Sequence, residues 1–145
     1  MRLPRFAPVL ALFALLGVTS GANAQTTWNS IRLTWTAPGD DGSIGTASDY
    51  DIRFSTSPIT SGTFSIATRW PTVPAPAPPG SSQSATITGL APGTTYYFAL
   101  KSSDDAGNWS AMSNVVSRAT ALAPDVVRPA PIAISVSATT DSSAT

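Results

Sequence analysis

The stretch from Gly89 to Leu100, which reads GLAPGTTYYFAL, decides the fold class of this 145-residue chain. Pro92 presets φ and Gly93 allows φ > 0, so the first half predicts a tight turn. Three ring or aliphatic residues then recur with the period of a strand that buries one face: Tyr96, Phe98 and Leu100. The residues between them are predicted to point the other way: Tyr97, Ala99 and Lys101.

Tyr96 stands at the start of this strand, a few residues beyond the turn. A tyrosine in that place can bend its hydroxyl back onto upstream backbone, an arrangement known in β-sandwiches as the tyrosine corner. We expect Tyr96 to make such a bond.

Other segments show the same alternation, and clusters of turn-forming residues separate them. Strands are predicted at Ser30–Thr36, Tyr50–Phe54, Ser84–Thr88 and Asn114–Thr120, with a short strand around Phe64–Ile66. Turns are predicted at Ala37–Gly45 and Asp104–Asn108. Five or six short strands without helical periodicity indicate an all-β sandwich.

Five prolines lie within residues 71–79, so no central strand is expected there. One interpretation is a stiff, solvated connection that shields a sheet edge. The other is a polyproline ligand for an aromatic groove, but the usual readers of such ligands are intracellular.

Residues 1–24 have the features of a secretory signal peptide. Arg2 and Arg5 precede an apolar run, Ala7–Val18, and Ala22-Asn23-Ala24 forms a small-x-small cleavage pattern. The run is shorter than the roughly 20 residues that span a bilayer, which disfavours a retained membrane anchor. We expect cleavage near Ala24, a secreted or cell-surface product, and no membrane insertion of the mature chain.

Composition excludes several classes of function. Without residues 1–24 the chain keeps six of its eight basic residues and all eight aspartates, a net charge of about −2. A nucleic-acid partner would need a basic face, so none is expected. The chain has no Cys and no His. This composition excludes disulfides, Cys or His zinc sites, and nucleophiles that depend on an imidazole base.

Residues 30–120 resemble a fibronectin type III domain of the kind found in bacterial secreted multidomain proteins. The resemblance is carried by Trp35, Tyr50, Leu90 with Pro92, Gly93 and Thr94 before Tyr96, and the closing runs Asp104–Ser110 and Ser113–Val116. It implies an immunoglobulin-like sandwich of about seven strands, with strands A, B and E facing strands C, C′, F and G. The predicted structural core is Trp35, Tyr50, Leu90, Tyr96, Phe98 and Leu100.

One departure from the family pattern concerns strand A. Only Gln25–Asn29 separate the predicted cleavage site from the first strand. Strand A is therefore short or missing, or another segment covers that edge of the sheet.

The C-terminal part predicts further organisation. Residues 25–120 form the domain, and residues 121–131 read as a Pro-rich linker. Thr139–Thr145 can be aligned with Thr26–Arg32, with identities at Thr139, Thr140 and Ser143. Residues 132–145 would then begin a second, truncated repeat of a longer protein. The alternative is a disordered Ser/Thr-rich tail.

Few residues could carry chemistry. Four carboxylates are expected at one end of the sandwich and are a weak calcium candidate: Asp40, Asp41, Asp104 and Asp105. Solvated turn residues are the simpler interpretation. A paired-carboxylate glycosidase would need a cleft that a closed sandwich lacks. No catalytic residue, cofactor or other metal ligand is predicted, so the chain is not expected to be an enzyme. Asn108-Trp109-Ser110 matches a glycosylation acceptor.

Two functional classes remain. The first is a non-catalytic spacer or protein-interaction module of a secreted or cell-surface multidomain protein. The second is a carbohydrate-binding accessory module of an extracellular hydrolase, which would bind glycans through exposed rings among Trp28, Trp70, Tyr97 and Trp109. Glycan binding requires at least two rings side by side, whereas scattered rings favour the spacer.

Overall fold

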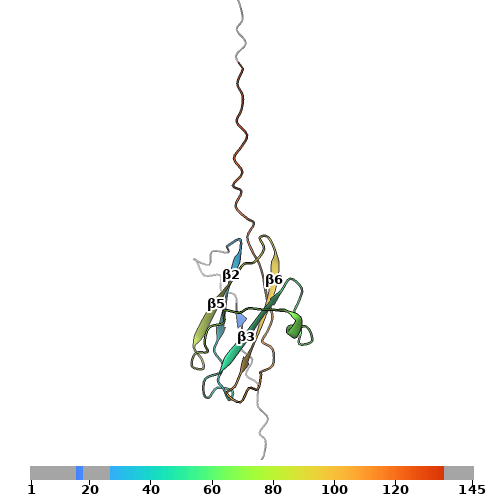
Figure 1. The fold of residues 1–145 in the computed structure, drawn as a ribbon. Coiled ribbons are helices and arrows are strands. Elements are labelled where there is room, and N and C mark those ends of the chain that lie inside the picture. Colours follow the sequence, from blue (N-terminus) through green and yellow to red (C-terminus); the bar gives the residue numbers. More distant parts are fainter. Residues whose placement is uncertain (1–15, 18–26, 136–145) are drawn as a thin grey trace, which may run out of the picture.

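The computed structural model describes residues 16–17 and 27–135, and within them two antiparallel sheets face each other (Figure 1). The three-stranded sheet has the order β1 (Leu16–Gly17), β2 (Ser30–Thr36), β5 (Ser82–Thr88). The four-stranded sheet has the order β4 (Thr68–Arg69), β3 (Asp49–Ser55), β6 (Thr95–Ser103), β7 (Val116–Ala119). This order confirms the predicted immunoglobulin-like sandwich, with sheets A-B-E and C′-C-F-G.

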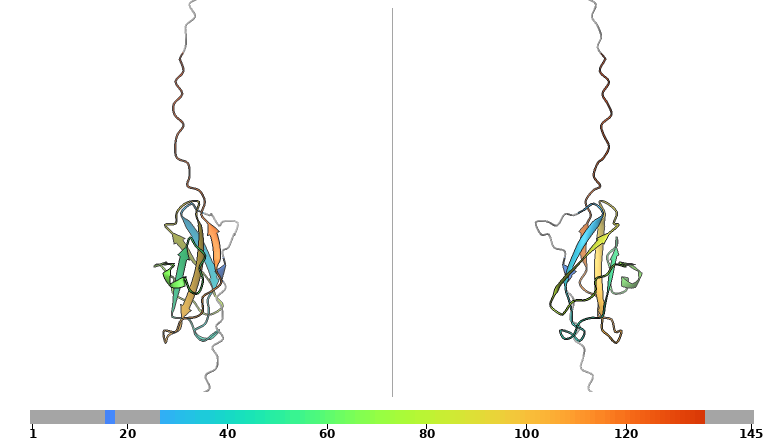
Figure 2. Two further views of the ribbon diagram at one scale, coloured as in Figure 1. Left: turned by 90° about the vertical axis from the view of Figure 1, so that its right-hand side faces the viewer. Right: turned by 60° about the vertical axis from the view of Figure 1, so that its left-hand side comes forward.

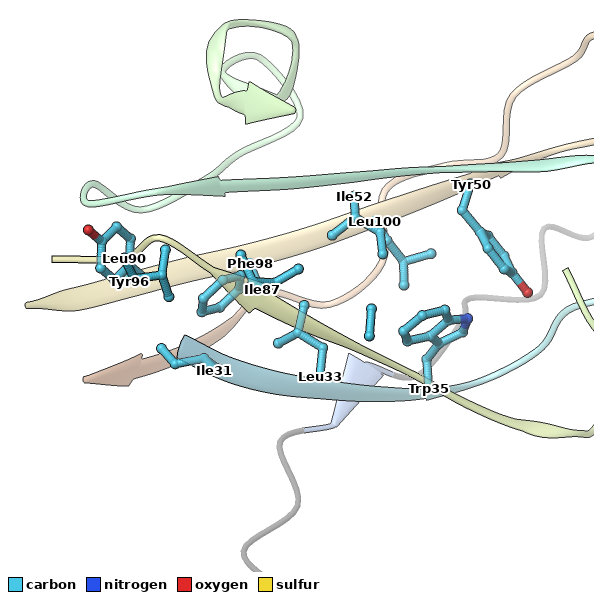
Figure 3. Packing of buried hydrophobic residues seen from close by; sticks show 11 residues of the cluster. Ile31, Leu33, Trp35, Tyr50, Ile52, Ile87, Leu90, Tyr96, Phe98 and Leu100 are labelled. Carbon is cyan, nitrogen blue, oxygen red and sulfur yellow. The ribbon is translucent and has the colours of Figure 1, made fainter. Parts of the chain in front are cut away.

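The core lies between the sheets and is built from alternate residues of each strand (Figure 3). All six residues predicted for the core belong to it, together with Ile31, Leu33, Ile52, Ala85 and Ile87. Trp35 and Tyr50 meet edge to face across the two sheets, with ring centroids 5.4 Å apart. Such pairs stabilise by about 1 kcal/mol beyond the area they bury.

The stretch that decides the fold behaves as expected. Gly93 has φ +59°, so the turn needs a residue that tolerates the left-handed region. The Tyr96 hydroxyl accepts a hydrogen bond from the N–H of Ala91 at 3.0 Å, which forms the predicted corner. The hydroxyl thus satisfies a backbone donor.

The short strand predicted around Phe64–Ile66 is wrong, because those residues form the 3₁₀ helix η1. The reason is local: Thr60 accepts from the N–H of both Thr63 and Phe64, and the Thr63 hydroxyl accepts from Thr60. The η1 segment lies over the outer face of the four-stranded sheet. There Phe64 packs with Ala99, which is consequently fully buried although it points away from the main core.

The strand predicted at 114–120 is shorter in the structure, where β7 spans only Val116–Ala119. Before it, two serines bond β6 through their side chains. Leu100 donates its N–H to Ser113 Oγ at 3.0 Å, and Ser102 donates to Ser110 Oγ at 3.1 Å. Both serines also donate their own backbone N–H to β6, to the carbonyls of Leu100 and Ser102. Side-chain oxygens therefore replace only the acceptors of a regular ladder in this part of the sheet.

The Pro-rich segment 71–79 contains no strand, as predicted, and is fixed beside β5. Gln83 of β5 donates from Nε2 to the Ala75 carbonyl at 2.8 Å, and its Oε1 accepts from the Ala77 N–H at 3.1 Å. One side chain of an edge strand thus fixes the position of the segment.

Leu16 and Gly17 occupy the position of strand A and pair with Trp35 and Thr34 of β2. They lie inside the predicted signal peptide. Residues 136–145, which include the proposed repeat match, lie outside the described residues. In the part of the chain that the structure describes, no helix has both the length and the apolar character needed to cross a membrane.

Candidate functional site

The four aspartates considered for calcium lie on two loops that meet at one end of the sandwich. Asp40 Oδ1 accepts from the Asp105 N–H at 3.1 Å and so ties the β2–β3 loop to the loop after β6. Asp41 lies in a tight turn that bridges to Ile44. Among residues 16–17 and 27–135, no three acidic side chains come together in a way that could hold a metal ion.

Asp104 serves the internal structure of its loop. Its Oδ1 accepts from the Asn108 backbone N–H, and its Oδ2 accepts from the Asn108 side-chain amide, both at 2.7 Å. These two bonds, the side-chain bond first, hold the pKa of the Asp104 carboxyl below its ordinary value of 3.8. The carboxylate is thus used to close the turn.

The four rings considered for glycan stacking are dispersed over the molecule. Trp28 and Trp109 are 43% and 47% exposed, but Trp28 precedes β2 at one end and Trp109 bridges to Ser103 at the other. Trp70 packs against the main core, and Tyr97 packs against the Phe64 cluster on the outer sheet face. No two of these rings form one flat platform.

A charged surface on the four-stranded sheet was not singled out from the sequence. Arg53 pairs with Asp51 at 3.0 Å, and Arg69 reaches the same carboxylate at 3.4 Å. Arg53 also donates to the carbonyls of Ser65 and Ala67, at 2.6 and 3.1 Å, and so fastens the η1 segment to β3. In the sequence, the charged residues Asp49, Asp51 and Arg53 follow one another along one face of the strand, and this pattern could have indicated the charged surface.

Cationic groups also approach the ring of Phe64. The Arg53 guanidinium lies 5.3 Å from the ring centroid and the Lys101 ammonium lies 4.9 Å from it. Both distances are within the range of cation–π attraction. This outer-face cluster is held together by its own charges, and Phe64 already fills it. The cluster therefore explains how the η1 segment packs on the sheet and does not form a ligand site.

A second polar group lies at the margin of the core. The Tyr50 hydroxyl donates to Gln83 Oε1 at 2.6 Å, and so joins β3 to the side chain that holds the Pro-rich segment. Burial raises the pKa of this hydroxyl, and the nearby Trp35 indole lowers it by less. The Trp35 Nε1 group does not reach hydrogen-bond geometry with any described residue and is fully buried.

Comparison with known proteins finds relatives of which this chain spans only a small part. The chain is 38% identical over 100 residues to chitinase A1 of Niallia circulans, a match that covers 69% of this chain and 11% of that protein. It is 46% identical over 54 residues to calcium-activated chloride channel regulator 1 of Mus musculus, which covers 37% of this chain and 6% of that protein.

Among solved structures, the sensor domain of the anti-sigma factor RsgI4 in Pseudobacteroides cellulosolvens aligns with a TM-score of 0.46 and 14% identity. That alignment covers 76% of this chain and 96% of the sensor domain. The sequence pattern of the fibronectin type III domain matches residues 20–117, which is more than half of the chain. Together with the two facing sheets and the Tyr96 corner, this match shows that the chain belongs to the fibronectin type III domain family.

Proposed function

We propose that this chain supplies a non-catalytic spacer or interaction module to a secreted or cell-surface multidomain protein. The observation that carries the proposal is the size of the shared segment. The two relatives share only 11% and 6% of their lengths with this chain, and their names describe different activities. A segment found inside such different proteins is expected to serve as a reusable module.

The surface of the domain supports a role without catalysis. Asp40 and Asp104 both accept backbone N–H groups of the loop after β6, and Asp51 is paired with two arginines. These carboxylates are used to hold the loops and the sheet, and the pKa of the Asp104 carboxyl is lowered by its bonds to Asn108, whereas a general acid requires a raised pKa. Secretion is proposed from the features of residues 1–24.

The second candidate is a carbohydrate-binding accessory module. It is favoured by one observation, the 38% identity to a protein named chitinase. The dispersed rings speak against it, because stacking on a polysaccharide chain needs neighbouring aromatic faces. Trp109, on the loop after β6, is the ring with the most exposed surface among the candidates.

A depletion assay separates the two candidates. The chain from Gln25 to Thr145 is incubated with insoluble chitin and with cellulose, and the protein left in solution is measured. The spacer proposal expects no depletion by either polymer. Depletion that is lost in Trp109→Ala, but kept in the control Trp28→Ala at the opposite end, would overturn it in favour of glycan binding.

Secretion is tested independently of ligand binding. We expect a chain expressed with residues 1–24 to appear outside the cytoplasm, and its intact mass to correspond to a first residue of Gln25. A product that keeps Met1 and stays with the cells would contradict the proposed location, whatever the outcome of the polysaccharide assay.

A further inference from the structure

The chain stays bonded to the domain after its last strand ends. β7 ends at Ala119, but the next residue, Thr120, donates its N–H to the Thr94 carbonyl at 3.0 Å. One residue further on, the Ala121 carbonyl accepts the N–H of Gly93 at 2.9 Å. The first two residues after β7 are therefore held by the turn that precedes β6.

Thr120 also bonds this turn through its side chain. Its hydroxyl donates to the Ala91 carbonyl at 2.6 Å and accepts the Thr94 N–H at 3.0 Å. The residue is buried, with 5% of its surface exposed. A hydroxyl can donate one hydrogen bond and accept others, so this single group satisfies a backbone acceptor and a backbone donor of the turn at once.

Ala91 is the residue where the turn, the core and the end of β7 meet. Its N–H donates to the hydroxyl of Tyr96, and its carbonyl accepts from the hydroxyl of Thr120. Tyr96 belongs to the main core. Both backbone groups of one turn residue are thus bonded by side chains, and through them the position of Thr120 is fixed relative to the core.

The contact with the turn continues to Leu122. A Cβ atom at residue 93 would lie only 2.9 Å from Leu122 Cδ2, so the absence of a side chain at Gly93 makes room for Leu122. Leu122 is nevertheless 81% exposed and buries little surface there. Its contact limits the direction of the chain, whereas the buried hydroxyl of Thr120 supplies the attachment.

Residues 123–131 follow and have a different character. They are exposed and lie outside the strands, and Figures 1 and 2 show the chain leaving the sandwich here as an extended trace. Pro124, Pro129 and Pro131 restrict its backbone and favour an extended conformation. A stiffened segment points in a defined direction only if its first residues are fixed.

We propose that the Thr120 hydroxyl is a clamp that sets the direction in which the chain leaves the domain. Residues 120–122 then move with the domain as one body, and any hinge lies at residue 123 or beyond. The use of the clamp rests on the proposed spacer role, because a spacer with a fixed exit orients the segment that follows as well as separating it from the domain. A flexible exit would leave the spacer role standing, and depletion by a polysaccharide would leave the clamp standing.

The first test measures backbone order by ¹⁵N relaxation in the chain used for the depletion assay. At Ala121 and Leu122 we expect order parameters of about 0.85, as in a rigid strand, and a fall below about 0.6 in Thr120→Val, which keeps the shape but lacks the hydroxyl. Thr120→Ser keeps the hydroxyl and should stay rigid.

The matched control for this test is Thr94→Val. It removes a hydroxyl from the same turn, one that bonds the Pro92 carbonyl and not the end of β7. Its order parameters at residues 121 and 122 should equal those of the parent chain. Order parameters below about 0.6 there in the parent chain, or unchanged values in Thr120→Val, would overturn the proposal.

The second test measures the direction of the chain through distances between two spin labels. The sequence has no cysteine, so labels attach only at introduced positions. Labels at Thr86→Cys on β5 and at Ala123→Cys should give one narrow distance distribution, which becomes at least twofold broader with Thr120→Val but not with Thr94→Val. A pair within the domain, Thr86→Cys and Ser117→Cys, should keep its width in Thr120→Val. Equal widths in all backgrounds, or broadening of both label pairs, would contradict a clamp that acts on the exit of the chain.

Discussion

Replacing Tyr96 with Phe removes one hydroxyl and tests the bond that closes the turn before β6. The Tyr96 oxygen accepts the Ala91 N–H at 3.0 Å, and the ring is 8% exposed and packs 6.0 Å from Phe54. Phe keeps the ring contacts, so the change isolates the hydrogen bond. An unpaired buried donor is destabilising by about 1–3 kcal/mol. Ala91 itself is exposed, so water can partly replace the hydroxyl. We therefore expect the lower limit, about 1 kcal/mol.

The effect is measured as a shift in the urea midpoint, followed by tryptophan fluorescence. With an m-value of about 2 kcal/mol/M, a loss of about 1 kcal/mol lowers the midpoint by about 0.5 M. The matched control is Tyr97→Phe, which removes a hydroxyl from the neighbouring residue on the outer face. Hydrogen exchange at the Ala91 amide should accelerate in Tyr96→Phe alone. An unchanged midpoint, or an equal shift in the control, would refute the assignment of the corner bond.

Four further outcomes follow from the same contacts. Phe64→Ala should lower stability by about 3 kcal/mol, because the ring is buried against Ala99, and should make the η1 segment sensitive to proteases; an uncut segment would contradict this. The folded-state pKa of Tyr50 is raised, so stability should fall as pH rises above about 10, and the fall should be shallower in Tyr50→Phe, as followed by urea titration. The pKa of Asp104 is lowered, so its contribution is present above about pH 3.8 and lost as pH falls further; Asp104→Asn should flatten this acid loss in urea midpoints. Added calcium should leave Tm unchanged in calorimetry, and a calcium-dependent rise would restore Asp40 and its neighbours as ligands.

The alternation of residues was enough to find the strands that build the core. Trp35, Tyr50 and Tyr96 lie where a period of two places them, because each strand buries one face. The same rule failed at Phe64, where the pattern Phe-Ser-Ile reads as a strand. There the side chains of Thr60 and Thr63 each accept a hydrogen bond from the other's backbone N–H and favour a tight turn, and hydrophobic periodicity does not register this competition.

Contacts between distant segments were beyond sequence reasoning. Ala99 was expected to point away from the core, which it does, but the η1 segment covers it and nothing near Ala99 in the sequence predicts that cover. Gln83 holds the Pro-rich segment through both groups of its amide, a role that its place in a strand does not suggest. The fold family predicted that the loops of Asp40 and Asp105 would meet at one end of the sandwich. The hydrogen bond between these two residues could be seen only in the structure.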